Sequence, residues 1–157
     1  MSDHITFRRI FAAPCSNPLA GEWTDAEDAV ETFEALRARF GDTDIEVMDH
    51  EGFGTLEPFT FPERIVEIDE EIEVHGAALV AWRRYHGNRE ADDIQRFENA
   101  YRGEWSSDRE FGEETADDMI KCSGAPEEVT RYFDYDSWTR DMMFDHFSQD
   151  GFYFTAF

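Results

Sequence analysis

The stretch from residue 24 to residue 41 reads TDAEDAVETFEALRARFG. Its apolar side chains recur at the spacing of one helix face and stop before a glycine: Ala26, Val30, Phe33, Leu36, Phe40 and then Gly41. Thr24 lies three residues before Glu27, the arrangement of a capping box. The stretch therefore predicts an amphipathic helix that begins after Thr24 and turns acidic residues away from its apolar face.

Strands are predicted on both sides of this helix. Residues 5–11 combine β-branched and aromatic side chains in partial alternation, and the loop signals of residues 14–21 follow them. Residues 45–48 form a second short apolar run. The sequence thus predicts a small α+β sub-domain over residues 1–60.

From Pro62 onward the apolar period is helical. Proline suits the first helical position, Ile65, Ile68 and Ile72 mark one face, and Gly76 follows as a stop. A second helix is expected over residues 77–85, and a third carries Ile94, Phe97 and Tyr101 on one face. These patterns predict an all-helical sub-domain over residues 61–103.

The last part, residues 104–157, returns to a mixed pattern. Ser107 and Glu110 form a second capping box, Asp136 is expected to cap a final helix, and the aromatic residues 152–157 predict a terminal strand. The fold class expected for the whole chain is α+β, arranged as an elongated row of three small sub-domains with a highly acidic surface.

The charge of the chain limits its partners. The 157 residues contain 37 acidic and 14 basic side chains, a net charge of -23, and the acids are spread along the sequence instead of forming a tail. With 41% hydrophobic residues the chain has enough apolar surface for a core. Direct binding to nucleic acid or an anionic membrane is disfavoured, because phosphate contacts need Lys and Arg. A basic partner is expected, and the absence of a signal sequence or long apolar run favours a soluble, cytoplasmic protein.

Catalytic chemistry finds little support. Glu113-Glu114 and Asp117-Asp118 could form an acid and base pair only if burial separated their pKa values, and a charge run of this kind usually faces water. The histidines and cysteines show no metal-ligand spacing, and glycine-rich phosphate loops are missing. We expect no catalytic residue, no metal site and no cofactor.

Carboxylates instead recur along the predicted helices at intervals of three or four residues. Neighbours at that spacing lie about 5–6 Å apart on one helix face, close to the ~7 Å between phosphates along a DNA strand. The excess charge matches roughly 39 Å of duplex. The carboxylates predicted to imitate a phosphate track are Asp25, Glu27, Asp28, Glu31, Glu34, Glu63, Glu67, Asp69, Glu70, Glu73, Asp92, Asp93, Glu110, Glu113, Glu114, Asp117 and Asp118.

A salt-adapted acidic surface is the alternative explanation of this charge. Lys121 is the one lysine beside thirteen arginines, and haloarchaeal proteins use little lysine. Fifteen phenylalanines and four tryptophans point the other way, since salt adaptation does not require extra large apolar residues. Composition alone leaves both explanations open.

Several segments, in their order, resemble the ArdA family of antirestriction proteins over nearly the whole length. They are GEW at 21–23, DHEGF at 49–53, YRGEWSS at 101–107, YFDYD at 132–136, RDM at 140–142 and the aromatic C-terminal strand. The loop over residues 14–18, PCSNP, departs from the Tyr- and Asn-containing stretch that is more usual there.

The resemblance implies an elongated three-part homodimer whose acidic surface looks like bent B-DNA. Such a protein occupies the DNA-binding site of type I restriction-modification enzymes, at their specificity and methyltransferase subunits, and protects incoming phage or plasmid DNA in a bacterial host. The family's antirestriction motif, near its dimer contact, maps onto Asn99, Tyr101, Gly103, Glu104 and Trp105. Whether modification is blocked along with restriction stays open.

Two other functions remain. An acidic scaffold or antagonist of other basic DNA-binding proteins would share the charge but not depend on the shape of a groove. A carboxylate enzyme would instead need one or two strongly perturbed acids in an apolar pocket.

Overall fold

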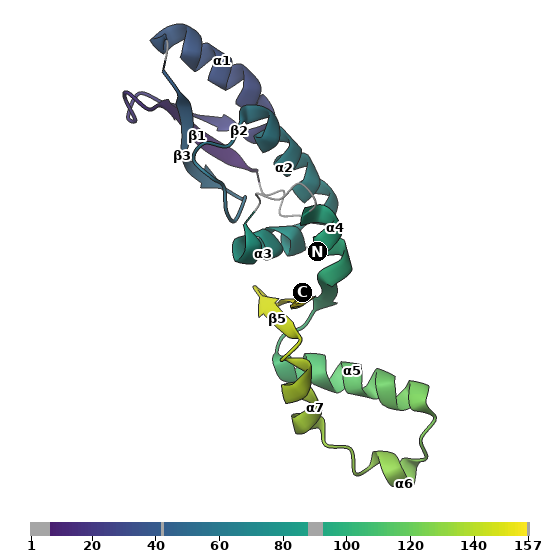
Figure 1. Cartoon of the computed structure of the whole chain (residues 1–157). Helices are drawn as coiled ribbons and strands as arrows, with labels where there is room; N and C mark the ends of the chain where they lie inside the picture. The colour runs from purple at the N-terminus through teal and green to yellow at the C-terminus, as the bar shows by residue number, and fades with distance from the viewer. Residues whose placement is uncertain (1–6, 42, 88–92, 157) are drawn as a thin grey trace. The chain divides into compact units, whose positions relative to one another are not determined.

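The computed structural model describes residues 7–41, 43–87 and 93–156. The described part contains seven α-helices and two three-stranded antiparallel sheets, which confirms the α+β class (Figure 1). The chain divides into two compact units, residues 1–89 and 90–157. The three-part division at residues 60 and 103 stays a prediction.

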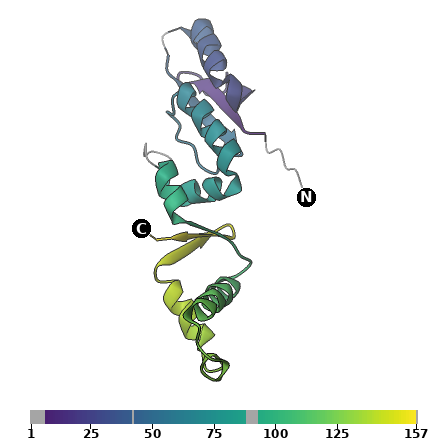
Figure 2. The ribbon, with the colours of Figure 1, turned by 90° about the vertical axis from the view of Figure 1, so that its right-hand side faces the viewer.

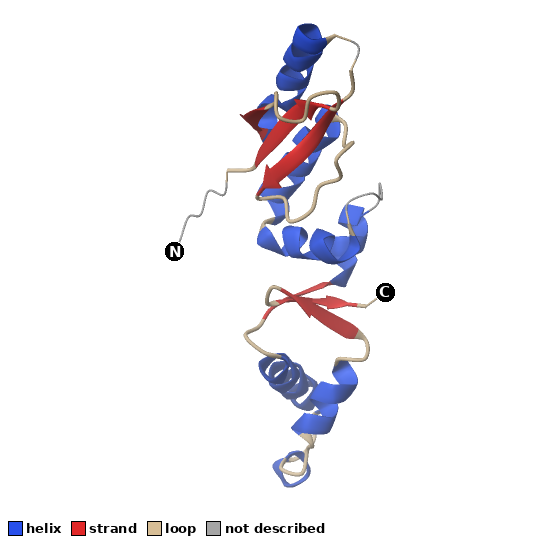
Figure 3. Cartoon of the chain, turned by 90° about the vertical axis from the view of Figure 1, so that its left-hand side faces the viewer, coloured by secondary structure: helices blue, strands red, loops and turns tan. Residues whose placement is uncertain are grey.

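The sheet of the first unit has β1 (Arg9–Pro14) at its centre. It pairs antiparallel with β2 (Glu22–Asp25) on one side and β3 (Ile45–Glu51) on the other (Figure 3). The two predicted strands are thus present with shifted bounds, and the first continues to Pro14, past the predicted end. Residues 5 and 6 of that prediction lie outside the described residues. Proline is tolerated in this central strand because β2 pairs with β1 only up to Ala12, so Pro14 has β3 as its one partner strand.

Three helices complete the first unit: α1 (Ala29–Phe40), α2 (Pro62–His75) and α3 (Ala77–His86). α1 packs against β1 and β3, and α2 packs against α1. Their apolar faces bury Phe33 and Ile68 to 1% exposure beneath Ile10 of β1, which is fully buried. The predicted start and end of α2 are confirmed, because Pro62 opens the helix and Gly76 caps it with a φ of 71°.

The capping box predicted at Thr24 is wrong. Thr24 lies in β2 opposite Ile10, and its hydroxyl accepts a hydrogen bond from the Thr32 hydroxyl at 2.9 Å. A 3-10 turn, η1 (Ala26–Asp28), follows, and α1 begins only at Ala29 without a side-chain cap. Pairing with the central strand extends the backbone of Thr24, so sheet formation overrides the local helix signal.

The second unit contains four helices and three strands in its described residues. Its elements are α4 (Asp93–Ala100), β4 (Tyr101–Glu104), α5 (Asp108–Ser123), α6 (Glu127–Thr130), α7 (Tyr135–Met142), β5 (His146–Gln149) and β6 (Phe152–Thr155). The strand order is β4-β6-β5, so the predicted terminal strand lies at the centre of its sheet. Residue 157 of that prediction lies outside the described residues.

α5 and α7 lie side by side in this unit (Figure 2). Gly112 permits the close approach, because a Cβ atom at this position would lie 1.8 Å from Oγ1 of Thr139. The core beneath them includes Phe111 and Phe154, which are almost completely buried. The orientation of α5 therefore depends on a small residue at its contact with α7.

This unit confirms one predicted helix cap, at Ser107, and corrects a predicted helix end and a second predicted cap. Ser107 caps α5, and its hydroxyl accepts a hydrogen bond from the backbone N–H of Glu110 at 3.1 Å. Tyr101 does not extend the preceding helix, because it opens β4 and pairs with Phe154.

The cap of α7 is Asp134 and not Asp136. Its carboxylate accepts a hydrogen bond from the backbone N–H of Ser137 at 2.9 Å and another from the Ser137 hydroxyl at 2.7 Å. Asp136 lies inside the first turn of the helix. The sequence offers two acids two residues apart, and only the first lies three residues before a serine that can donate twice.

Candidate functional site

The carboxylates around the start of α1 are open to solvent. Glu27, Asp28, Glu31 and Glu34 are all exposed, and within the described part of the chain none of their carboxylates takes part in a hydrogen bond or ion pair. Glu27 and Asp28 belong to η1, so the helical spacing predicted from Glu27 onward begins with a 3-10 turn. Asp25, at the end of β2, is also exposed and lies 3.4 Å from the guanidinium of Arg9.

The carboxylates of α2 are more strongly balanced by arginines. Glu63, Glu67, Glu70 and Glu73 are exposed. Arg64 donates to Glu67 at 3.1 Å, and the buried guanidinium of Arg8 pairs with Asp69 and Glu73. A buried guanidinium requires such partners. These ion pairs attach the chain before β1 to α2 and reduce the net charge that this helix offers.

The carboxylates of α5 form the third group. Glu110, Glu114, Asp117 and Asp118 are exposed, and Glu113 is half-buried, with a bond of 2.7 Å from Arg109. The hydroxyl and the backbone N–H of Ser106 both donate to Glu110, and these hydrogen bonds lower the pKa of its carboxyl group. α5 therefore carries a row of acids at its surface.

Aromatic side chains donate hydrogen bonds to several acids of α5. The indole N–H of Trp105 donates to Glu114 at 2.7 Å, and the hydroxyl of Tyr135 donates to Asp117 at 2.7 Å. The second bond, and burial to a lesser degree, raises the pKa of Tyr135. Sequence reasoning found these carboxylates through their spacing but missed the donors, which lie on other elements.

Asp93 differs from the other predicted acids. It lies at the start of α4 and is only 4% exposed, so its carboxylate is not presented to solvent. Its predicted neighbour Asp92 lies outside the described residues. Helical spacing alone does not separate a buried acid from an exposed one.

The five residues assigned by resemblance to the antirestriction motif lie in and around β4, and they divide into internal and exposed residues. Tyr101 stacks on Phe97 with ring centroids 5.5 Å apart. Gly103 has a φ of 141°, and a Cβ atom there would lie 2.9 Å from the ring of Trp105. Asn99 and Glu104 are exposed. The aromatic and glycine members thus build the unit itself, and the polar members face outward.

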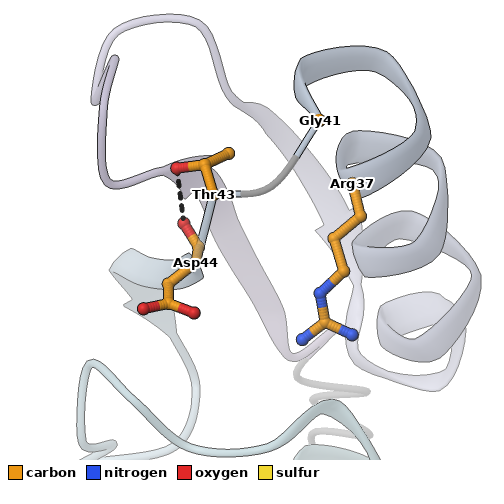
Figure 4. A pocket seen from close by; sticks show the side chains of 4 residues that line it. All are labelled: Arg37, Gly41, Thr43 and Asp44. Atoms are coloured by element: carbon orange, nitrogen blue, oxygen red, sulfur yellow. Dashed lines mark hydrogen bonds between the residues drawn. The ribbon is translucent and has the colours of Figure 1, made fainter.

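In the described residues no group of His, Cys, Asp and Glu side chains is arranged to hold a metal ion, and no helix there is long and apolar enough to cross a membrane. An open hollow of about 580 Å³ at the end of α1 is lined by Arg37, Gly41, Thr43 and Asp44 (Figure 4). Among the described residues that line it are one acid, Asp44, and one base, Arg37.

These features define an acidic α+β protein with carboxylates exposed on three helices. A family model described as antirestriction protein (ArdA) matches residues 17–154. The chain belongs to the ArdA family of antirestriction proteins. The match begins after β1 and extends from β2 into β6, the last described strand. None of the curated proteins used for comparison matched the chain.

Proposed function

We propose that this protein blocks type I restriction-modification enzymes by imitating B-DNA. The observation that carries the proposal is a run of exposed carboxylates at η1 and α1 (Glu27, Asp28, Glu31 and Glu34), which have no partner among the described residues, in a chain of an antirestriction family. Their spacing of about 5–6 Å along a helix face is comparable to the phosphate repeat of a DNA strand.

The proposed action is competition for a basic groove. Restriction enzymes contact DNA phosphates through Lys and Arg, and complementary charge speeds the encounter and fixes the register. A net charge of -23 supplies that complementarity without any chemical step. The protein is accordingly an inhibitor and not an enzyme, and it acts in the cytoplasm of a bacterial host at the specificity and methyltransferase subunits.

A plating experiment tests the proposal in cells. The protein is expressed in a host with an active type I system, and unmodified phage is plated on it. We expect the efficiency of plating to approach that on a host that lacks the restriction subunit. Unchanged restriction at confirmed expression of folded protein would contradict the proposal and favour another basic DNA-binding protein as the partner.

We also propose that the protein acts as a homodimer. Asn99 near the end of α4 and Glu104 in β4, an edge strand of its sheet, are exposed, and their segment is the one that the resemblance assigns to the family's dimer contact. Sedimentation at micromolar concentration is expected to give twice the 18.3 kDa chain mass. A monomer at that concentration would refute dimerisation and leave inhibition by single chains.

A further inference from the structure

Three carboxylates of α5 are each held by an aromatic side chain from a different part of the chain. The donor and acceptor pairs, each 2.7 Å apart, are Trp105 with Glu114, Tyr135 with Asp117 and Tyr153 with Asp108. The first donor precedes α5, the second lies in α7 and the third in β6. The pairs therefore connect the acidic helix to the rest of its unit.

The rings of these donors are fixed by packing. Tyr153 is 2% exposed and stacks on Phe111 at 4.7 Å, while Trp105 packs against the same ring at 4.8 Å. Tyr135 packs edge-on against Phe133 at 5.1 Å. Because each ring is held in place, the carboxylate that accepts from it is held as well.

A neutral donor fixes a carboxylate without cancelling its charge. The ion pair of Arg64 with Glu67 on α2 orients a carboxylate too, but it neutralises the charge. The acids Glu31 and Glu34 on α1 keep their charge, yet the described residues offer no group that orients them. The aromatic pairs of α5 combine fixed geometry with full negative charge, and within the described part of α5 the neutral donors of Ser106 do the same for Glu110.

We propose that Trp105, Tyr135 and Tyr153 are positioning residues that set the α5 carboxylates in place for the basic groove of the restriction enzyme. The inference rests on the proposed function. Ordering a side chain on binding costs free energy, and a side chain that is already ordered avoids that cost. α5 therefore contributes more affinity per carboxylate than α1 does.

Substitutions that keep an aromatic side chain and the net charge test this inference. Trp105→Phe and Tyr135→Phe each remove one donor and are expected to weaken displacement of DNA from a purified type I methyltransferase by about 2- to 10-fold. Tyr132→Phe is the matched control, since Tyr132 is 81% exposed, and it should leave displacement unchanged. Unchanged displacement by both donor variants would overturn the inference.

A double-mutant cycle separates positioning from a purely structural role. If Trp105 acts through Glu114, then Trp105→Phe should have no further effect in a Glu114→Ala background, although it still lowers the melting temperature. Tyr135→Phe with Asp117→Ala provides a second cycle in case one variant fails to fold. Additive losses in a cycle of folded variants would overturn the inference.

DNA displacement by the wild-type protein distinguishes a failure of this inference from a failure of the proposed function on which it rests. If the wild type does not displace DNA, the proposed function itself fails. If the wild type displaces DNA and the aromatic variants match it, only the positioning role is lost.

Discussion

Replacement of Glu27, Glu31 and Glu34 together by Gln should weaken inhibition only modestly. The three side chains are exposed and unpaired within the described residues, so their loss breaks no internal contact. The fold should persist, because the core side chains beneath them, such as Phe33, are untouched.

The expected loss of inhibition follows from the exposure of the three carboxylates. Exposed charge pairs on a helix surface contribute about 0.3–0.5 kcal/mol each, so the loss of three such contacts costs about 0.9–1.5 kcal/mol and predicts roughly a 5- to 12-fold rise in the concentration needed for half-displacement of DNA. Any single substitution should change it by roughly 2- to 3-fold at most. The effect should shrink as salt rises, because exposed charges are screened.

The assay is titration of each variant against a type I methyltransferase bound to labelled DNA. Asp141, Asp145 and Asp150, exposed acids outside the predicted set, provide a control triple substitution to Asn with the same change in charge. The control should have a smaller effect than the α1 triple. Complete loss of inhibition from one α1 substitution would refute distributed mimicry and indicate a single critical residue.

Three further predictions concern the second unit. Gly112→Ala should destabilise the protein by about 1–3 kcal/mol in urea unfolding, because the new methyl group meets Thr139. Ser107→Ala should cost about 1 kcal/mol through loss of the α5 cap, while Ser107→Asp should keep most of it. Hydrogen bonds from the backbone N–H and the hydroxyl of Ser137 lower the pKa of Asp134 below its ordinary 3.8. The stability they give is therefore present above that pH and is lost as pH falls through the lower folded value. Ser137→Ala should raise this pKa in an NMR titration, and an unchanged pKa would contradict the assignment.

The sequence best predicts features that depend on interactions between residues close together in the chain. α2 begins and ends as predicted because Pro62 and Gly76 act within one turn of the chain. The strands β2 and β4 were missed, since each has four residues and pairs with a strand outside its own stretch of sequence. β5 was also missed, although Asp150-Gly151 after it is a local signal of the hairpin with β6. Thr24 carries a valid local cap signal, and pairing with β1 outweighs it.

The residues of the candidate site could likewise be predicted where their exposure follows from local helix geometry. Helical spacing identified most of the exposed acids of α1, α2 and α5, because it depends only on local geometry. Spacing could not show that Asp93 is buried or that Arg8 pairs with Asp69, since both depend on tertiary packing. The aromatic donors to α5 carry no sequence signal, because Tyr135 and Tyr153 follow their acceptors by 18 and 45 residues.

Competition for a type I methyltransferase tests DNA mimicry most directly. Purified protein is titrated into the enzyme bound to labelled target DNA at two salt concentrations. The account predicts stoichiometric release of DNA that weakens at the higher salt, as expected for binding through complementary charge. Retention of DNA by the enzyme at both salt concentrations, with the protein fully folded, would contradict it.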